Sequence, residues 1–299
     1  DETDTTKKGS CVITVYGKNN YGGSEEGVEK EFILVEQLIG KAKVKGIQNL
    51  EYDGSEKEQV EETLDVMIGK TEVPANCYEV TYSDNVNIGD ALITVIAKPE
   101  NCDYEFGGAV TAKFKILPVK FKPSKTEDRV TAEFVNVDYQ EELPVVTYSG
   151  SSLTPEVVVY DEVLGVNLVE DIDYVVTYKN NVNVGNKGSV TVMGIKNYSG
   201  SINLNFSVVP KDMGENGEDF KVQVKNSAYT GKNIQPRILV WDKDVVLKQG
   251  KDYELCIEPA KEVVDFDGNI KEKGKYIITI QGKGNYTSEL EEQYYLSVY

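Results

Sequence analysis

The sequence predicts an all-β fold in which one small domain is repeated in tandem, and three observations support this prediction. Short segments alternate apolar and polar residues, as half-buried strands do. Turns rich in Asn and Gly separate these segments, and a helical period is almost absent. The same order of strands and turns also recurs along the 299 residues of the chain.

The best-preserved unit is a predicted β-hairpin in the middle of the chain. Residues 173–179 alternate in the manner of a strand, and residues 180–185 form an Asn- and Gly-rich turn. A second strand follows at residues 188–194, and residues 197–200 form a closing turn. We interpret this hairpin as the reference against which the other copies are aligned.

Three full copies of this pattern are visible. In each, a Tyr-x-Gly turn precedes the tyrosine that opens the hairpin, by 26, 26 and 24 residues (Tyr52 to Tyr78, Tyr148 to Tyr174, Tyr229 to Tyr253). The hairpin tyrosines of successive copies are 96 and 79 residues apart. Solenoid units repeat at ~20–50 residues, so the period is that of a small domain.

These spacings predict the domain boundaries. A partial repeat with closing strands only occupies residues 1–36, and full repeats occupy 41–119 (divergent), 127–210 and 218–299. Residues 120–126 and 211–219 carry turn residues and charge and are predicted linkers. Two strands do not bury a stable core, so residues 1–36 would belong to a cut fourth unit or lean on the next domain.

Each full copy contains about six or seven short predicted strands, which favours tandem immunoglobulin-like β-sandwiches in an elongated array. Residues 56–64 are the main helical candidate. Alignment with the second copy favours a charged edge strand or an irregular segment there, with a short helix second. A β-grasp-like repeat carrying that helix is the alternative fold.

Composition excludes several classes of function. With 32 basic and 50 acidic residues the net charge is −18, which disfavours nucleic acid and anionic membranes as partners. The sequence has no His, the usual general base and metal ligand. No apolar run approaches the ~20 residues of a membrane-spanning helix. We therefore expect no enzyme, no cofactor, no nucleic-acid partner and no membrane insertion.

The repeated motifs resemble a known family. The segments Tyr-Thr-Gly-Lys…Pro-Arg-Ile-Leu-Val, Gly-Lys-Asp-Tyr and Gly-Lys-Gly-Asn-Tyr-Thr of the third copy are similar to Ig-like repeats of large Gram-positive cell-surface proteins, close to bacterial Ig-like and MBG repeats. The resemblance implies stalk or adhesive modules and supplies no catalytic residues. The first copy departs from it, with Cys77 where Asp173 and Asp252 stand.

Cys77 and Cys102 are the candidate disulfide. Cys77 precedes the first hairpin strand of the first copy and Cys102 follows the second, so both lie at one end of the hairpin. We predict that their side chains come within bonding distance, which an extracellular location would permit. Cys11 and Cys256 lie in predicted strands, and we expect both to be buried.

Other candidates have simpler structural explanations. The tyrosines of Asp173–Tyr174 and Asp252–Tyr253 could stack on a sugar, but a tyrosine at a fixed place in each domain is typical of a core. We expect the same of Tyr21, Tyr104, Tyr198 and Tyr286, a set identified from the alignment of the copies.

Two loops and one aromatic residue complete the candidates. Residues 180–185 offer oxygens to a Ca²⁺ ion, although Asn and Gly also suit a tight turn. Residues 265–269 superficially resemble a calcium loop, but the glycine is misplaced and Tyr276 stands where the final Glu belongs. We interpret them as a hairpin tip, and we expect Trp241 to be partly buried.

The resulting hypothesis is a non-catalytic, monomeric segment of a bacterial surface or secreted protein. It would serve as an extracellular stalk or present a binding region, with a host or cell-wall glycan or protein as partner. The alternatives are a carbohydrate-binding module and an accessory region of a surface glycosidase. Exposed coplanar aromatics would favour sugar binding, and buried ones the stalk.

Overall fold

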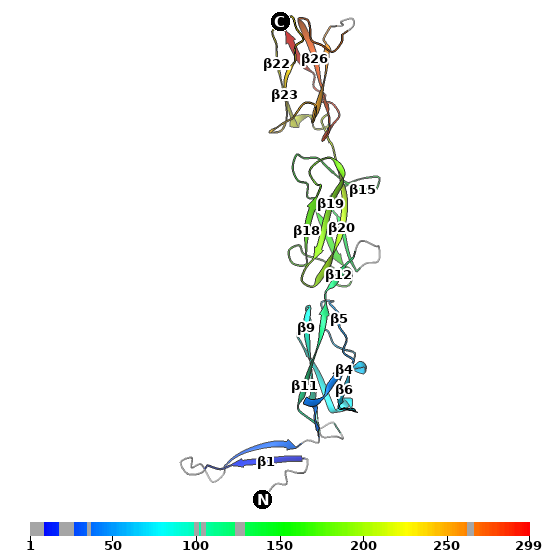
Figure 1. Ribbon diagram of the computed structural model, residues 1–299, viewed down its shortest axis with the longest axis vertical. Helices are drawn as coiled ribbons and strands as arrows, with labels where there is room; N and C mark the ends of the chain where they lie inside the picture. Colours follow the sequence, from blue (N-terminus) through cyan, green and yellow to red (C-terminus); the bar gives the residue numbers. More distant parts are fainter. Residues whose placement is uncertain are drawn as a thin grey trace. The chain divides into compact units, whose positions relative to one another are not determined.

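The computed structural model describes residues 9–17, 27–34, 37–98, 102, 106–122, 129–261 and 266–299. Within these ranges the regular elements are β-strands and three-residue 3₁₀ turns, as Figure 1 shows. The predicted all-β class is confirmed. None of the described helices is long and apolar enough to span a membrane.

The chain divides into two compact units. The first contains Asp1–Phe121 together with the turn Gly194–Gly200. The second contains Lys122–Met193 and Ser201–Tyr299. The turn that closes the second sequence copy therefore groups with the first copy rather than with the rest of its own.

A β-hairpin opens the described part of the first unit. Strand β1 (Gly9–Val15) pairs antiparallel with β2 (Val28–Leu34). These are the two strands that the sequence predicts for the partial repeat. Val15 and Val28, which face each other in the register, are 62% and 73% exposed. These two apolar side chains of the hairpin are thus mostly exposed to solvent.

The first copy contains two larger sheets. One has the order β5-β11-β9-β8 and the other β4-β6-β7. Their bounds are β5 Leu50–Glu51, β8 Tyr78–Ser83, β9 Gly89–Ala97, β11 Ala109–Leu117, β4 Lys43–Lys45, β6 Asp65–Ile68 and β7 Thr71–Glu72. The short strands β3 (Gln37–Leu38) and β10 (Phe106–Gly107) pair in parallel. The 3₁₀ turns are η2 Ile39–Lys41, η3 Glu61–Thr63 and η4 Ala75–Cys77.

Both sheets of the first copy contribute to one core. Val66 from β6 and Ile93 from β9 are fully buried, and Phe114 from β11 is 2% exposed. The inward positions follow the two-residue period of a strand, as in β9, where Ala91, Ile93 and Val95 are all buried. Leu92 and Ile96 on the opposite face are apolar as well but only half-buried, so burial rather than residue type identifies the core face of this strand.

Residues 56–64 form no strand. The segment is irregular and ends in η3, so the irregular alternative of the prediction holds. Gln59 of this segment is buried, with 5% exposure. Its side-chain Oε1 accepts from the Gln48 N–H at 2.7 Å and its Nε2 donates to the Gln48 carbonyl at 2.9 Å. A side-chain amide thus replaces the backbone ladder at this place.

The second copy also has two sheets. The larger runs β14-β15-β20-β19-β18, and the smaller runs β13-β16-β17. Their bounds are β14 Asp138–Gln140, β15 Leu143–Thr147, β18 Tyr174–Lys179, β19 Gly185–Gly194, β20 Tyr198–Val209, β13 Val130–Phe134, β16 Val157–Asp161 and β17 Val166–Asn167. Phe134 of one sheet meets Phe206 of the other edge to face, with centroids 5.8 Å apart.

The third copy repeats this arrangement. Its sheets are β22-β23-β24 and β25-β26-β28, and both contribute to one buried cluster. Their bounds are β22 Phe220–Lys225, β23 Arg237–Asp242, β24 Val245–Val246, β25 Tyr253–Pro259, β26 Gly274–Gly282 and β28 Tyr294–Val298. Val240, Ile278 and Leu296 are fully buried between them.

The predicted linkers are partly strand, which corrects the sequence interpretation. Strand β12 (Val119–Phe121) pairs in parallel with Tyr198–Gly200 of β20. Strand β21 (Lys211–Asp212) pairs in the same way with β27 (Tyr286–Thr287), and the turn η6 (Gly217–Asp219) follows it. Residues 123–126 lie outside the described part. These segments are held because their backbone groups find partners in the closing turns.

Candidate functional site

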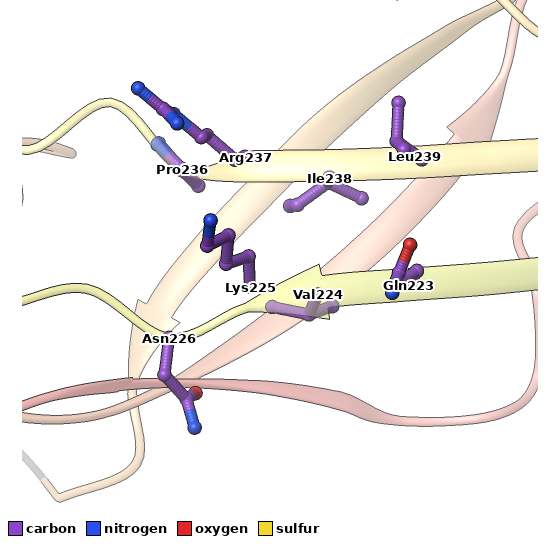
Figure 2. A pocket seen from close by; sticks show the side chains of 8 residues that line it. All are labelled: Gln223, Val224, Lys225, Asn226, Pro236, Arg237, Ile238 and Leu239. Carbon is purple, nitrogen blue, oxygen red and sulfur yellow. The ribbon is translucent and has the colours of Figure 1, made fainter.

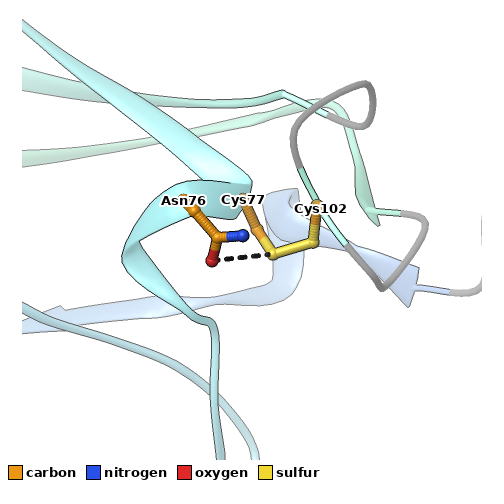
Figure 3. The surroundings of a disulfide bond; sticks show 3 residues. All are labelled: Asn76, Cys77 and Cys102. Carbon is orange, nitrogen blue, oxygen red and sulfur yellow. Dashed lines mark hydrogen bonds between the residues drawn. A yellow bond between two sulfur atoms is a disulfide. The ribbon is translucent and has the colours of Figure 1, made fainter.

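Cys77 and Cys102, the pair selected from the sequence, form a disulfide, and Figure 3 shows Asn76 beside it. Their Cα atoms are 4.6 Å apart, and Cys77 is 1% exposed. Cys77 ends η4, and its carbonyl accepts from the Lys98 N–H beyond β9 at 2.8 Å. The bond therefore ties both strands of the hairpin together at the end where β8 begins and β9 finishes.

The other two copies have an aspartate at the position of Cys77. Asp173 Oδ2 accepts from the Val169 N–H, and Asp252 Oδ2 accepts from the Lys248 N–H, both at 2.9 Å. Each carboxylate thus holds the tight turn in front of its hairpin. The first copy has exchanged a hydrogen-bonded turn for a covalent link.

The described tyrosines at equivalent positions of the copies belong to the cores. Tyr174 and Tyr253 are 5% and 2% exposed, and Tyr198 and Tyr286 are each 4% exposed. These rings offer no platform for a sugar. Burial also raises the pKa of the Tyr174 and Tyr253 hydroxyls. Tyr21 and Tyr104 lie outside the described residues.

Two other tyrosines form hydrogen bonds to the backbone through their hydroxyl groups. Tyr178 OH donates to the Pro155 carbonyl at 2.9 Å, and the Gln59 N–H donates to Tyr82 OH at 3.1 Å. These two tyrosines lie at equivalent places in the hairpins of the second and first copies. Neither is among the candidates predicted from the sequence, although Tyr82 and Tyr178 coincide when the first and second copies are aligned.

Asn181 in the hairpin turn of the second copy and Asn85 in that of the first are used by the fold. Asn181 Nδ2 donates to the Leu153 carbonyl at 2.9 Å, and the Asn181 carbonyl accepts from the Leu153 N–H at 2.8 Å. Asn85 makes the same two bonds with Lys57, at 3.0 and 2.7 Å. The paired bonds favour the turn interpretation of residues 180–185 over a calcium site.

Asn183, the third asparagine of the turn in the second copy, contacts the third copy. Within the second unit, Asn285 Nδ2 donates to Asn183 Oδ1 at 3.0 Å, while the Val184 N–H donates to Asn285 Oδ1 at 2.9 Å. Beside these bonds, Tyr148 meets Tyr286 edge to face with centroids 5.4 Å apart. The Nδ2 and Oδ1 atoms of Asn285 therefore both form hydrogen bonds to the hairpin tip of the second copy.

The first unit contains the same contacts at equivalent positions. Asn197 Nδ2 donates to Asn87 Oδ1 at 3.2 Å, and the Ile88 N–H donates to Asn197 Oδ1 at 3.3 Å. Tyr52 meets Tyr198 edge to face with centroids 6.2 Å apart. We call each such set, with its parallel strand pair, an asparagine clasp.

A buried polar cluster lies beside the clasp of the second unit. Lys211 Nζ contacts Asp242 Oδ1 at 2.7 Å and Asp219 Oδ2 at 2.6 Å, and Tyr286 OH donates to Asp242 Oδ2 at 3.1 Å. Burial disfavours the charged form of Lys211, but the two carboxylates outweigh it and raise its pKa. Burial and Asp242 also raise the pKa of Tyr286. Lys211 and Tyr286 thus both bind the buried carboxylate of Asp242.

An open groove of about 790 Å³ lies at one end of the β22–β23 pair, as Figure 2 shows. Its walls come from the last residues of β22 and the first residues of β23. The residues that line it are Gln223, Val224, Lys225, Asn226, Pro236, Arg237, Ile238 and Leu239.

The remaining candidates are located as follows. Trp241 is half-buried, as expected, with Lys221 Nζ 5.7 Å from its ring centroid. Cys256 is exposed and free, so the expectation of burial is wrong. Strand β25 points Tyr253 inward, and the two-residue period therefore turns Glu254, Cys256 and Glu258 outward. For Cys11, strand β1 is described but its side chain is not.

The loop at residues 266–269 is a turn stabilised by charge. Asp267 Oδ1 accepts from the Asn269 N–H at 3.0 Å, and Asp267 Oδ2 pairs with Lys271 Nζ at 2.6 Å. The ammonium of Lys271 lowers the pKa of Asp267 to about 2. Residue 265 lies outside the described part. Asp267 is thus already paired within its own turn.

Nothing in the described part of the chain gathers the ligands of a metal ion, since no group of three or more Cys, Asp or Glu is suitably placed. No protein-family model matches the sequence. A search of curated proteins also finds no significant match. The geometry of the clasps and of the groove is therefore the basis for a functional argument.

Proposed function

We propose that the chain is a non-catalytic, extracellular segment of a bacterial surface or secreted protein, built from tandem Ig-like β-sandwich repeats that act as a stalk or present a binding region. The observation that carries this proposal is the asparagine clasp, which recurs with the same atoms in both units. A repeated scaffold needs a repeated joint, whereas a catalytic domain does not.

The clasp suits a structural role because it combines three kinds of contact. Lys211 and Val119 donate backbone hydrogen bonds to the carbonyls of Asn285 and Asn197, both at 3.0 Å. The parallel strand pairs β21–β27 and β12–β20 continue from these bonds. Paired backbone, a bidentate side chain and an aromatic contact together restrict rotation more than a flexible linker does.

The disulfide supports an extracellular location. Such bonds persist mainly in oxidising environments outside the cytosol. The absence of His from the sequence disfavours acid–base catalysis near neutral pH. The buried tyrosines Tyr174, Tyr198, Tyr253 and Tyr286 weigh against a sugar-binding role for those positions.

The test is to loosen one clasp. In Asn285→Ala we expect a broader distribution of distances between a spin label on the second copy and one on the third. The lost hydrogen bonds should lower the coupling between these copies by about 1–2 kcal/mol, seen as a lower unfolding temperature of the third copy.

Asn203→Ala is the matched control. Asn203 is exposed, and its Oδ1 accepts from the Thr191 hydroxyl of the neighbouring strand at 2.7 Å. An Asn285→Ala distribution as narrow as that of the control would contradict the role of the clasp. Hydrolysis of a polysaccharide by the purified chain would contradict the non-catalytic assignment.

A further inference from the structure

The outward face of the β22–β23–β24 sheet carries an unusual set of residues for so acidic a chain. Directly opposed residues of neighbouring strands share one face of a sheet. The register therefore gives three rows of outward side chains, Val246–Trp241–Lys221, Leu239–Gln223 and Arg237–Lys225. We call these seven residues the cationic face. All are exposed or half-buried, and none is acidic.

One row of the cationic face is electrostatically unfavourable as it stands. Lys225 and Arg237 lie directly opposite each other, and like charges in such a pair destabilise a sheet. Neither makes an ion pair with any of the residues that the structure describes. A bound anion between the two side chains would remove this repulsion.

The fold does not require these charges. Phe220 pairs with Asp242 at one end of the sheet as Val130 pairs with Asp161 in the second copy. Counting five residues back from each aspartate places Arg237 at the position of Glu156. The second copy thus forms the same sheet with the opposite charge at this place. Of the second and third copies, only the third therefore has the cationic face.

The groove adds a place for a ring-shaped ligand beside these charges. It lies where the β22–β23 pair ends, with Lys225 and Arg237 as its last opposed residues (Figure 2). Leu239 is 48% exposed and forms an apolar wall further along β23. Trp241 follows two residues beyond, about 7 Å away at the rise of a strand.

We propose that the cationic face binds an acidic polysaccharide whose sugar rings carry carboxylates, that is, a uronic-acid polymer. The apolar faces of its rings stack on Trp241 and Leu239. Its carboxylates pair with Arg237, whose planar guanidinium takes a carboxylate through two hydrogen bonds, and with Lys225. This binding activity goes beyond the stalk role and does not depend on the clasps.

Trp241 makes a direct test possible because it is the single Trp of the sequence. We would titrate the full chain with polygalacturonate and follow tryptophan fluorescence at low and at physiological salt. The expected result is a saturable change in emission that weakens as salt screens the charges. Dextran, a neutral glucan, should leave the emission unchanged.

The variant Lys225→Glu/Arg237→Glu should raise the dissociation constant about tenfold or more, because two attractive charges become repulsive. Lys113→Glu/Lys115→Glu is the matched control, since it makes the same change in net charge on exposed positions of β11. It should bind as the parent does. Arg237→Glu alone is a second variant, because the second copy folds with a glutamate there.

Three results would overturn the proposal. One is an absent or unsaturable change with polygalacturonate. Another is an equal loss of affinity in the control variant, which would indicate a general charge effect. The third is equal binding of poly-L-glutamate with the same sensitivity to both variants, which would show that the face recognises charge without sugar. The clasp experiment is unaffected by any of these outcomes.

Discussion

Removal of the Cys77–Cys102 disulfide should destabilise the first copy strongly. The two cysteines are separated by 25 residues in the sequence. In the chain-entropy model, closing a loop of that length lowers the entropy of the unfolded state by an amount equivalent to about 3.5 kcal/mol at 25 °C. For a domain of this size, that loss corresponds to a fall in the unfolding temperature on the order of 15–25 °C.

Differential scanning calorimetry of Cys77→Ala/Cys102→Ala measures this effect. Alanine is the better replacement because Cys77 is 1% exposed, and serine would add the cost of a buried hydroxyl. Reduction of the parent protein should shift the transition of the first copy in the same direction. The transitions of the other copies should stay in place.

Cys256→Ser is the control for thiol chemistry, because Cys256 is free and exposed. Its unfolding temperature should match that of the parent. The reasoning would be refuted if the double variant lost less than about 1 kcal/mol. It would be refuted equally if reductant lowered the transition of the double variant as much as that of the parent.

Three further predictions concern Lys211 and Cys256. Lys211→Met should cost about 3–5 kcal/mol of unfolding free energy, because it leaves the buried Asp242 without its cation; urea denaturation measures this. Since the folded pKa of Lys211 is raised above 10.5, its contribution is complete below that pH and is lost as pH rises through the folded value. The stability difference between parent and Lys211→Met should therefore shrink above about pH 10.5, and a constant difference would contradict this. Native Cys256 should react with iodoacetamide without unfolding, and peptide mapping should find it modified while Cys77 is not.

The strands were predictable because their signal is local. In β9 and β26 burial follows the two-residue period around the polar residues Thr94 and Thr279, with Ile93, Val95, Ile278 and Ile280 fully buried. The same rule could have corrected one error. Cys256 follows inward-pointing Tyr253 by three residues, and an odd offset places it on the outer face of β25.

The clasp was not predictable, because its two halves are far apart in the sequence. Asn183 and Asn285 are 102 residues apart. Asn183 lies in a segment with the composition of an ordinary turn, and turn formation alone is enough to explain an asparagine there. The neighbouring Asn181 does satisfy its own turn, through Leu153. The two asparagines differ in the partner that each side chain contacts, and no local sequence pattern specifies that partner.

The sequence by itself determined the all-β class, the copies and the pairing candidates Cys77 and Cys102, because periodicity and repetition are properties of the chain. Only the tertiary structure decided which polar residues bond to partners within their own copy and which bond to residues outside it. Lys211 illustrates the reason. In the sequence it is a charged residue of a predicted linker, but in the fold it is 7% exposed between Asp219 and Asp242. Burial and partners depend on contacts between distant segments, and those contacts exist only after the chain has folded.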